Sequence, residues 1–259
     1  MRLDSAALLR DGWALWRRDR ALLLPLVGLA IFLPRLALQL LVPQWPMPEK
    51  GATGEEAMRA WSDAFAGWVG SYGGWYVAAL LIGLWGVLAV VTLYLDRNRP
   101  TVVGAAGRAL ALLPRYILVT VLIGLPTGGL LSLALAMPLL MIAVLAPLFY
   151  VYARTTLAAA VLAGEAPIGA VAAIARSWRL TRGHGWTLAW LLAGLMLSAA
   201  VIGGAVLAIG GLGGGSGDQV HPVLVGLTAA VAVAIESAAT LATALVGVAA
   251  YRRLASSGT

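Results

Sequence analysis

Long apolar runs alternate with short polar segments along the whole chain. Six of the runs reach about 20 residues, the length that an α-helix needs to cross a hydrocarbon layer roughly 30 Å thick. To within a few residues they cover 21–42, 73–95, 116–134, 137–161, 186–210 and 223–251. The pattern predicts an all-α polytopic membrane protein in which six transmembrane helices form three hairpins.

A basic segment with helical periodicity precedes each predicted hairpin, in residues 4–18, 100–115 and 167–182. In each segment the apolar positions fall on one stripe, with arginines beside it. Helices of this kind lie in the membrane interface with the apolar face in lipid. We therefore expect an amphipathic interfacial helix before each hairpin; an ordinary cytoplasmic loop that happens to be helical is the alternative. The three stripes consist of Ala6, Leu9, Trp13 and Trp16, of Val102, Ala106, Leu110 and Leu113, and of Val171, Ile174 and Trp178.

The recurrence of segment and hairpin predicts a single integral membrane domain, residues 1–259, with repeat-like units of about 1–95, 96–163 and 164–259. Identity between the units is low, so the repeat is one of layout. Residues 43–72, which contain Gly, Pro and four acids, are predicted to form a polar loop between the first two spans.

The arginines predict the orientation, because Arg and Lys concentrate in cytoplasmic loops. If both termini are cytoplasmic, the outer segments contain only Lys50 and Arg59 as basic residues. The cytoplasmic segments then contain Arg2, Arg10, Arg17, Arg18, Arg20, Arg97, Arg99, Arg108, Arg115, Arg154, Arg176, Arg179, Arg182, Arg252 and Arg253.

Composition strengthens the assignment to a membrane. The chain is 61% hydrophobic and 11% charged, whereas soluble domains are about 45–50% apolar and about 25% charged. The absence of cysteine excludes disulfides, thiolate metal sites and cysteine nucleophiles. We interpret the net charge of +7 as a result of topology, with added affinity for anionic head groups, and expect no nucleic-acid partner.

Residues 154–186 read RTTLAAAVLAGEAPIGAVAAIARSWRLTRGHGW. A span ends in Arg154, an acidic-proline turn follows, and an amphipathic helix leads into a Ser-Trp-Arg-Leu-Thr-Arg-Gly motif before the next span. This arrangement resembles the membrane domain family of glycerophosphoryl diester phosphodiesterases, in the form of a stand-alone bacterial inner-membrane member. The residues that match the family motif are Glu165, Ser177, Trp178, Leu180, Thr181 and Gly183, supported by Arg154.

The resemblance implies the membrane module without the enzyme. In the family's namesakes the phosphodiesterase reaction belongs to a separate soluble barrel domain with a metal-binding carboxylate cluster and paired histidines. This chain has no room for that barrel, and the predicted topology places its only histidines, His184 and His221, on opposite sides of the membrane. We therefore expect no catalytic site and no cofactor, in a multi-pass protein of the bacterial inner (plasma) membrane.

Three ionisable residues are candidates for an intramembrane polar site, because charged groups within spans are costly and suggest function. They are Arg35, Arg154 and Glu236. At about 1.5 Å per residue, Arg154 lies closer to Glu236 in depth than Arg35 does, and Arg35 is placed near the outer surface. We therefore predict an Arg154–Glu236 pair, which either joins the fourth and sixth spans or forms part of a solute or proton site.

These observations favour a non-enzymatic inner-membrane protein that interacts with lipids, or that scaffolds and regulates partners in the cell envelope. Its expected partners are membrane lipids, anionic at the cytoplasmic face, with a protein partner or a second copy of the chain. One alternative is a transporter or channel for a small solute, a lipid or an ion, using Glu236. Another is a membrane module associated with glycerophosphodiester metabolism.

Overall fold

The computed structural model describes residues 4–47, 54–96, 101–136, 138–213 and 222–256. Among these residues six helices are long and apolar enough to cross a membrane, which confirms the predicted all-α polytopic fold. The elements are α1 (Ser5–Val27), η1 (Gly28–Phe32), α2 (Leu33–Leu41), α3 (Glu55–Leu95), α4 (Val102–Ala136), α5 (Pro138–Thr155), α6 (Ala158–Gly164), α7 (Ala170–Leu180), α8 (Gly185–Gly213) and α9 (Pro222–Ser256).

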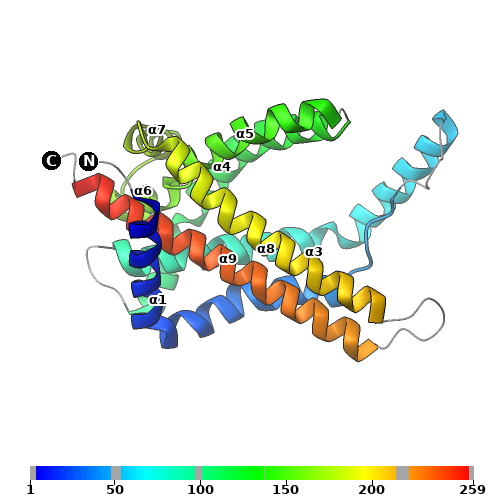
Figure 1. Cartoon of the computed structure of the whole chain (residues 1–259), viewed down its shortest axis with the longest axis horizontal. Coiled ribbons are helices and arrows are strands. Elements are labelled where there is room, and N and C mark those ends of the chain that lie inside the picture. The colour runs from blue at the N-terminus through cyan, green and yellow to red at the C-terminus, as the bar shows by residue number, and fades with distance from the viewer. Residues whose placement is uncertain (1–3, 48–53, 97–100, 137, 214–221, 257–259) are drawn as a thin grey trace.

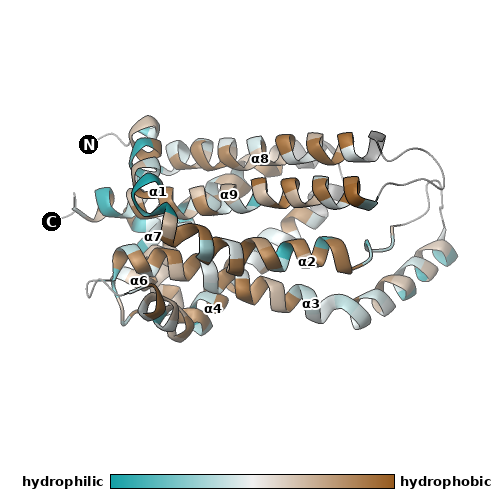
Figure 2. Cartoon of the chain, turned by 90° about the horizontal axis from the view of Figure 1, so that it is seen from below, coloured by the Kyte–Doolittle hydropathy of each residue, from teal (hydrophilic) through white to brown (hydrophobic). Residues whose placement is uncertain are grey.

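Both chain termini lie at one end of the molecule, here called the terminal end (Figure 1). From this end the α4–α5 hairpin diverges from the α8–α9 hairpin (Figure 1). Hydrophobic residues run along the helices, while hydrophilic residues gather at the terminal end and at the start of α3 (Figure 2). The core lies at the terminal end, where α6 is buried over residues 158–163 and packs against α3, α4, α7 and α9.

The first amphipathic segment and the first span belong to one bent helix. Asp4 caps α1, because its Oδ1 accepts a hydrogen bond of 3.0 Å from the backbone N–H of Ala6. The helix bends at Asp19, whose φ of −115° and ψ of 17° are not helical. Further on, Pro25 cannot donate a backbone hydrogen bond, and the chain passes through the π-helical turn η1 into α2.

The segment between the first two spans differs from the prediction. α3 already begins at Glu55, so that most of the predicted loop is helical, and its 41 residues extend about 60 Å. The first half carries a stripe of stacked rings at helical spacing, with centroids 5.6 Å apart for Trp61–Phe65 and 6.2 Å apart for Phe65–Trp68. The glycines and acids between these rings concealed the period of the helix.

The three predicted amphipathic segments are helical, but they are joined to the spans in different ways. The first is the start of α1, the second is the start of the continuous helix α4, and the third is the separate helix α7. Each segment buries a stripe of three residues: Leu8, Gly12 and Leu15 in the first, Ala105, Ala109 and Leu112 in the second, and Ala170, Ala173 and Ser177 in the third.

Bulky apolar residues lie beside these buried stripes and stay exposed. Trp13 is 59% exposed in the first segment, Leu110 is 61% exposed in the second, and Val171 is 67% exposed in the third. All three belong to the apolar stripes that the sequence predicts. One face of each segment therefore packs against the bundle, and the adjacent face exposes apolar side chains.

Candidate functional site

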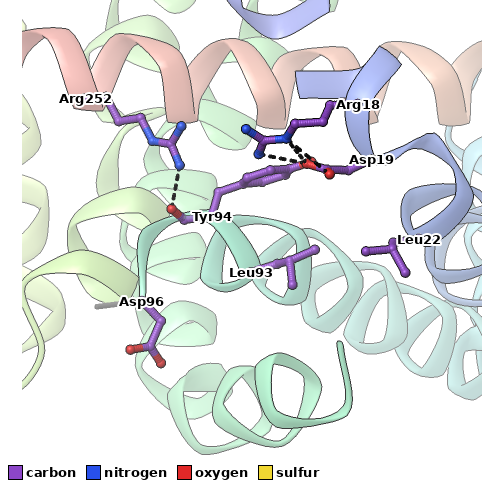
Figure 3. Close-up of a pocket in the computed structure, with 7 residues that line it drawn as sticks. All are labelled: Arg18, Asp19, Leu22, Leu93, Tyr94, Asp96 and Arg252. Carbon is purple, nitrogen blue, oxygen red and sulfur yellow. Dashed lines mark hydrogen bonds and ion pairs between the residues drawn. The ribbon is translucent and has the colours of Figure 1, made fainter. Parts of the chain in front are cut away.

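A pocket of about 450 Å³ opens at the terminal end, where α1, α3 and α9 meet. Figure 3 shows the side chains that line it, charged at the rim and apolar between. α1 contributes Arg18, Asp19 and Leu22, α3 with the residue after it contributes Leu93, Tyr94 and Asp96, and α9 contributes Arg252.

The bend of α1 at Asp19 positions the side chains on one side of the pocket. Arg18 donates to the Asp19 carboxylate from both Nε and Nη2, with the shortest distance 2.9 Å at Oδ2. The Tyr94 hydroxyl donates to the same oxygen at 2.9 Å. The non-helical residue of α1 thus ties the start of the first span to the end of α3.

Arg252 forms the opposite side of the pocket. Its Nη2 donates to the backbone carbonyl of Tyr94 at 2.7 Å, and its guanidinium carbon lies 5.8 Å from the centre of the Tyr94 ring (Figure 3). An arginine side chain carries five N–H donors, and Arg252 is exposed. Donors of Arg252 thus remain for an anion at the rim.

Asp96 closes the pocket below. Its side chain is only 5% exposed, and its Oδ2 lies 3.0 Å from Nε of Arg108 in α4. Leu22 and Leu93 lie between the charged groups in Figure 3. The pocket therefore combines guanidinium groups with an apolar floor.

A second cluster surrounds Arg154, which is 5% exposed at the end of α5. Nη2 donates to the carbonyl of Trp178 at 2.8 Å, and Nη1 donates to the carbonyl of Thr181 at 3.1 Å. The guanidinium carbon lies 4.5 Å from the centre of the Trp178 ring and 5.6 Å from that of Tyr150. Arg154 thus occupies the C-terminal end of α7, where the helix dipole favours a cation.

The other residues of the family motif complete this cluster. Ser177 donates to the Arg154 carbonyl at 2.7 Å, and Thr181 donates to the Ser177 carbonyl at 2.9 Å. Gly183 has a φ of +82°, which favours glycine, in the turn to α8. Leu180, the last residue of α7, packs against the core.

Glu165 joins the two ends of the third unit. It accepts from Nε of Arg176 at 3.1 and 3.2 Å and from the Tyr251 hydroxyl at 3.1 Å. The contacts of Arg154 and Glu165 therefore fix α7 between α5 and α9.

The predicted Arg154–Glu236 pair is wrong. Among the described side chains no ion pair joins these residues, and the Arg154 donors face the carbonyls of α7. Arg35 reaches this part of α9 instead, since its Nη1 donates to Thr240 Oγ1 at 3.0 Å. Measured from the terminal end, Arg35 lies about 22 Å beyond Arg20 and Glu236 about 24 Å before Arg252. On this count Arg35 and Glu236, rather than Arg154 and Glu236, lie at similar depths.

Sequence analysis missed the pocket at Asp19, Tyr94 and Arg252. The available signal was Asp19 itself, an acid between Arg18 and Arg20 at the border of an apolar run. A lone acid in such a place predicts a local partner, but the sequence does not identify Tyr94 as that partner.

No three His, Asp or Glu side chains lie close enough to hold a metal ion in the part of the chain that the structure describes. Comparison with models of known protein families, with characterised proteins and with solved structures finds no match for this chain.

Proposed function

We propose that this chain is a non-enzymatic, lipid-binding protein of a bacterial inner membrane, with both termini in the cytoplasm. Its terminal end binds the head group of an anionic phospholipid. Through this binding the protein holds or regulates partners at the cytoplasmic surface.

The pocket between α1, α3 and α9 carries the proposal. Arg18 and Arg252 place two guanidinium groups at its rim, and guanidinium forms strong, charge-assisted hydrogen bonds with phosphate. Leu22 and Leu93 provide an apolar floor suited to the glycerol and acyl portion of a lipid. A soluble anion has no apolar part to contact this floor, so a phospholipid fits the lining better than a free phosphate does.

The amphipathic segments support the same placement. Their exposed residues Trp13, Leu110 and Val171 suit the boundary between head groups and acyl chains. Arginines near an anionic leaflet each add about 1 kcal/mol of attraction. The segments thus support a position of the terminal end, and of the pocket within it, at the depth of the lipid head groups.

We further propose that the chain is a stand-alone member of the membrane domain family that its motif resembles. The support is that Ser177 binds both the Arg154 carbonyl and Thr181, while Glu165 binds Arg176 and Tyr251. The cluster gives the motif a role in building the fold, so the proposal does not require the chemistry of the family's namesakes.

Lipid retention tests the pocket. We expect protein purified in mild detergent from a bilayer of phosphatidylglycerol and phosphatidylcholine to retain phosphatidylglycerol selectively, as measured by native mass spectrometry. Arg252→Gln should lower this selectivity about tenfold, because it removes a charge-assisted bond worth about 1.5 kcal/mol or more. Arg59→Gln is the matched control, since Arg59 is an exposed arginine near the start of α3. Equal retention of both lipids by the unmodified chain, or unchanged selectivity in Arg252→Gln, would refute the proposal.

A further inference from the structure

Glu236 is an exposed carboxylate in the middle of α9, yet it does not belong to the outer apolar face of that helix. That face consists of Val223, Leu227 and Val231, which are 65%, 60% and 48% exposed. A helix turns by about 100° per residue, which places Glu236 about 180° around α9 from Leu227. The carboxylate therefore points to the side of α9 where the neighbouring helices lie.

The contacts of α9 identify those neighbours. Gly210 of α8 lies against the Thr228 side chain, about 80° to one side of Glu236. Thr240, about 40° to the other side, accepts the hydrogen bond from Arg35 of α2. Glu236 projects between the directions of α8 and α2, and its exposure shows that this space is not filled by side chains.

Thr240, which contacts Arg35 of α2, lies one helical turn after Glu236 in α9. Thr240 accepts from Arg35 Nη1 at 3.0 Å and donates to the Glu236 carbonyl at 2.9 Å, while the Arg35 side chain is half-buried. Among the described residues no ion pair joins Arg35 to Glu236. Arg35 thus contacts α9 one helical turn, about 5.4 Å along the axis, from the residue that carries the Glu236 carboxylate, and each of the two charged groups has capacity for a further partner.

We propose that Arg35, Thr240 and Glu236 form an intramembrane site for a zwitterionic phospholipid head group of the phosphoethanolamine type. Arg35, which Thr240 positions, donates hydrogen bonds to the phosphate, and Glu236 accepts hydrogen bonds from the ammonium group. Charged groups at bilayer depth are costly without partners, and a zwitterion neutralises both charges at once. Its two-carbon link between phosphate and ammonium suits groups about one turn apart.

The chemistry of the pair selects this class of ligand over others. An anionic head group would face repulsion from Glu236, and a simple cation would leave Arg35 unpartnered. A phosphocholine group lacks the N–H donors that a carboxylate at this depth requires. A second copy of the chain is disfavoured, because Glu236 lies opposite the outer face that another copy would contact. The site shares α9 with the Arg252 pocket but lies about 24 Å from Arg252 along that helix, and the proposal is independent of the function proposed for the pocket.

Lipid competition in nanodiscs tests the site. The chain is reconstituted in phosphatidylethanolamine and phosphatidylcholine at equal amounts, and the lipids retained after extraction into mild detergent are quantified by native mass spectrometry. We expect about tenfold enrichment of phosphatidylethanolamine on the unmodified chain and its loss in both Glu236→Gln and Arg35→Gln. Glu55→Gln, the same chemical change at an exposed position of α3, should retain the enrichment.

Equal retention of the two lipids by the unmodified chain would overturn the proposal without any variant. Enrichment that survives both Glu236→Gln and Arg35→Gln would also overturn it, because the site would then lie elsewhere. Soluble phosphoethanolamine, added in excess, distinguishes the sources: displacement of the lipid supports recognition of the head group alone, and no displacement supports recognition of the whole lipid.

Discussion

At the scale of single residues, the most unusual group is the buried cation of Arg154. No carboxylate lies within ion-pair distance of it among the described residues. Its charge is stabilised instead by the carbonyls of Trp178 and Thr181 at the end of α7 and by two aromatic faces. A desolvated cation–π contact contributes about 2 kcal/mol, so the arginine is a main connection between α5 and α7.

We predict that Arg154→Gln lowers the free energy of unfolding by about 3 kcal/mol, because it leaves buried carbonyls without a donor and removes the cation–π contacts. Arg154→Lys should cost less, since it keeps the charge but loses the paired donors of the guanidinium. SDS titration in mixed micelles measures both changes. Arg179→Gln removes an exposed arginine of α7, the helix that Arg154 contacts, and should stay within about 0.5 kcal/mol of the unmodified chain. Equal stabilities of Arg154→Gln and Arg179→Gln would show that the cluster does not hold the helices together.

How far the site could be predicted depends on whether partners are close along the chain. Arg154, Ser177 and Thr181 lie between the end of α5 and the turn after α7, and the sequence singled them out as parts of one motif. No ion pair involves Glu236 among the described residues, and depth along a helix does not show which side of the helix is covered. Arg35 was singled out from the sequence, but its contact with Thr240 depends on how α2 packs beside α9.

At the scale of elements, α3 and the π-helical turn η1 approach each other closely at Gly86. A Cβ at Gly86 would lie 2.7 Å from the Ala30 Cβ and 3.3 Å from Ile31 Cγ1. Small residues let membrane helices approach closely, where dispersion and weak contacts then hold them together. Gly83, one turn earlier in α3, has no atom of another group within 4 Å of such a Cβ.

Gly86 and Gly83 provide a matched pair of substitutions that tests helix packing. Gly86→Ala should lower the free energy of unfolding by about 1 to 3 kcal/mol, because the added methyl group overpacks the contact with Ala30. Gly83→Ala should be neutral or stabilising by up to about 1 kcal/mol, since alanine favours the helix more than glycine does. The same SDS titration distinguishes them, and a Gly86→Ala protein at least as stable as Gly83→Ala would contradict the close approach.

The elements also show which parts of the fold the sequence could predict. The spans were predictable because each apolar run must satisfy its own backbone hydrogen bonds in lipid, which favours a helix over the whole run. The beginning of α3 was not, since its ring stripe is interrupted by Gly67 and Gly70 and by acids. There the stacking of Trp61, Phe65 and Trp68 and the hydrogen bond from the Trp68 indole to the Pro43 carbonyl maintain the helix.

At the scale of the whole molecule, most of the arginines lie at the same end as the two termini. The pocket, the Arg154 cluster and both termini lie at the terminal end, which also collects most of the arginines, whereas the start of α3 extends away from it (Figure 1). Because arginines resist transfer across a membrane, this asymmetry predicts that the terminal end faces the cytoplasm and the start of α3 faces the opposite side.

The absence of cysteine makes this orientation directly measurable, because a single introduced thiol has no background. We expect Ser5→Cys, at the start of α1, to react with a membrane-impermeant maleimide only when the cytoplasmic face is open, as in inverted vesicles. Ala64→Cys, at an exposed position of α3, should react from outside in intact spheroplasts. Ala255→Cys near the end of α9 should follow Ser5→Cys, since six crossings return the chain to the side on which it began. Labelling of Ser5→Cys and Ala255→Cys from opposite sides would mean an odd number of crossings. Labelling of both from outside would mean that the orientation is the reverse of the one predicted. In that case the lipid at Arg252 could not come from the cytoplasmic leaflet.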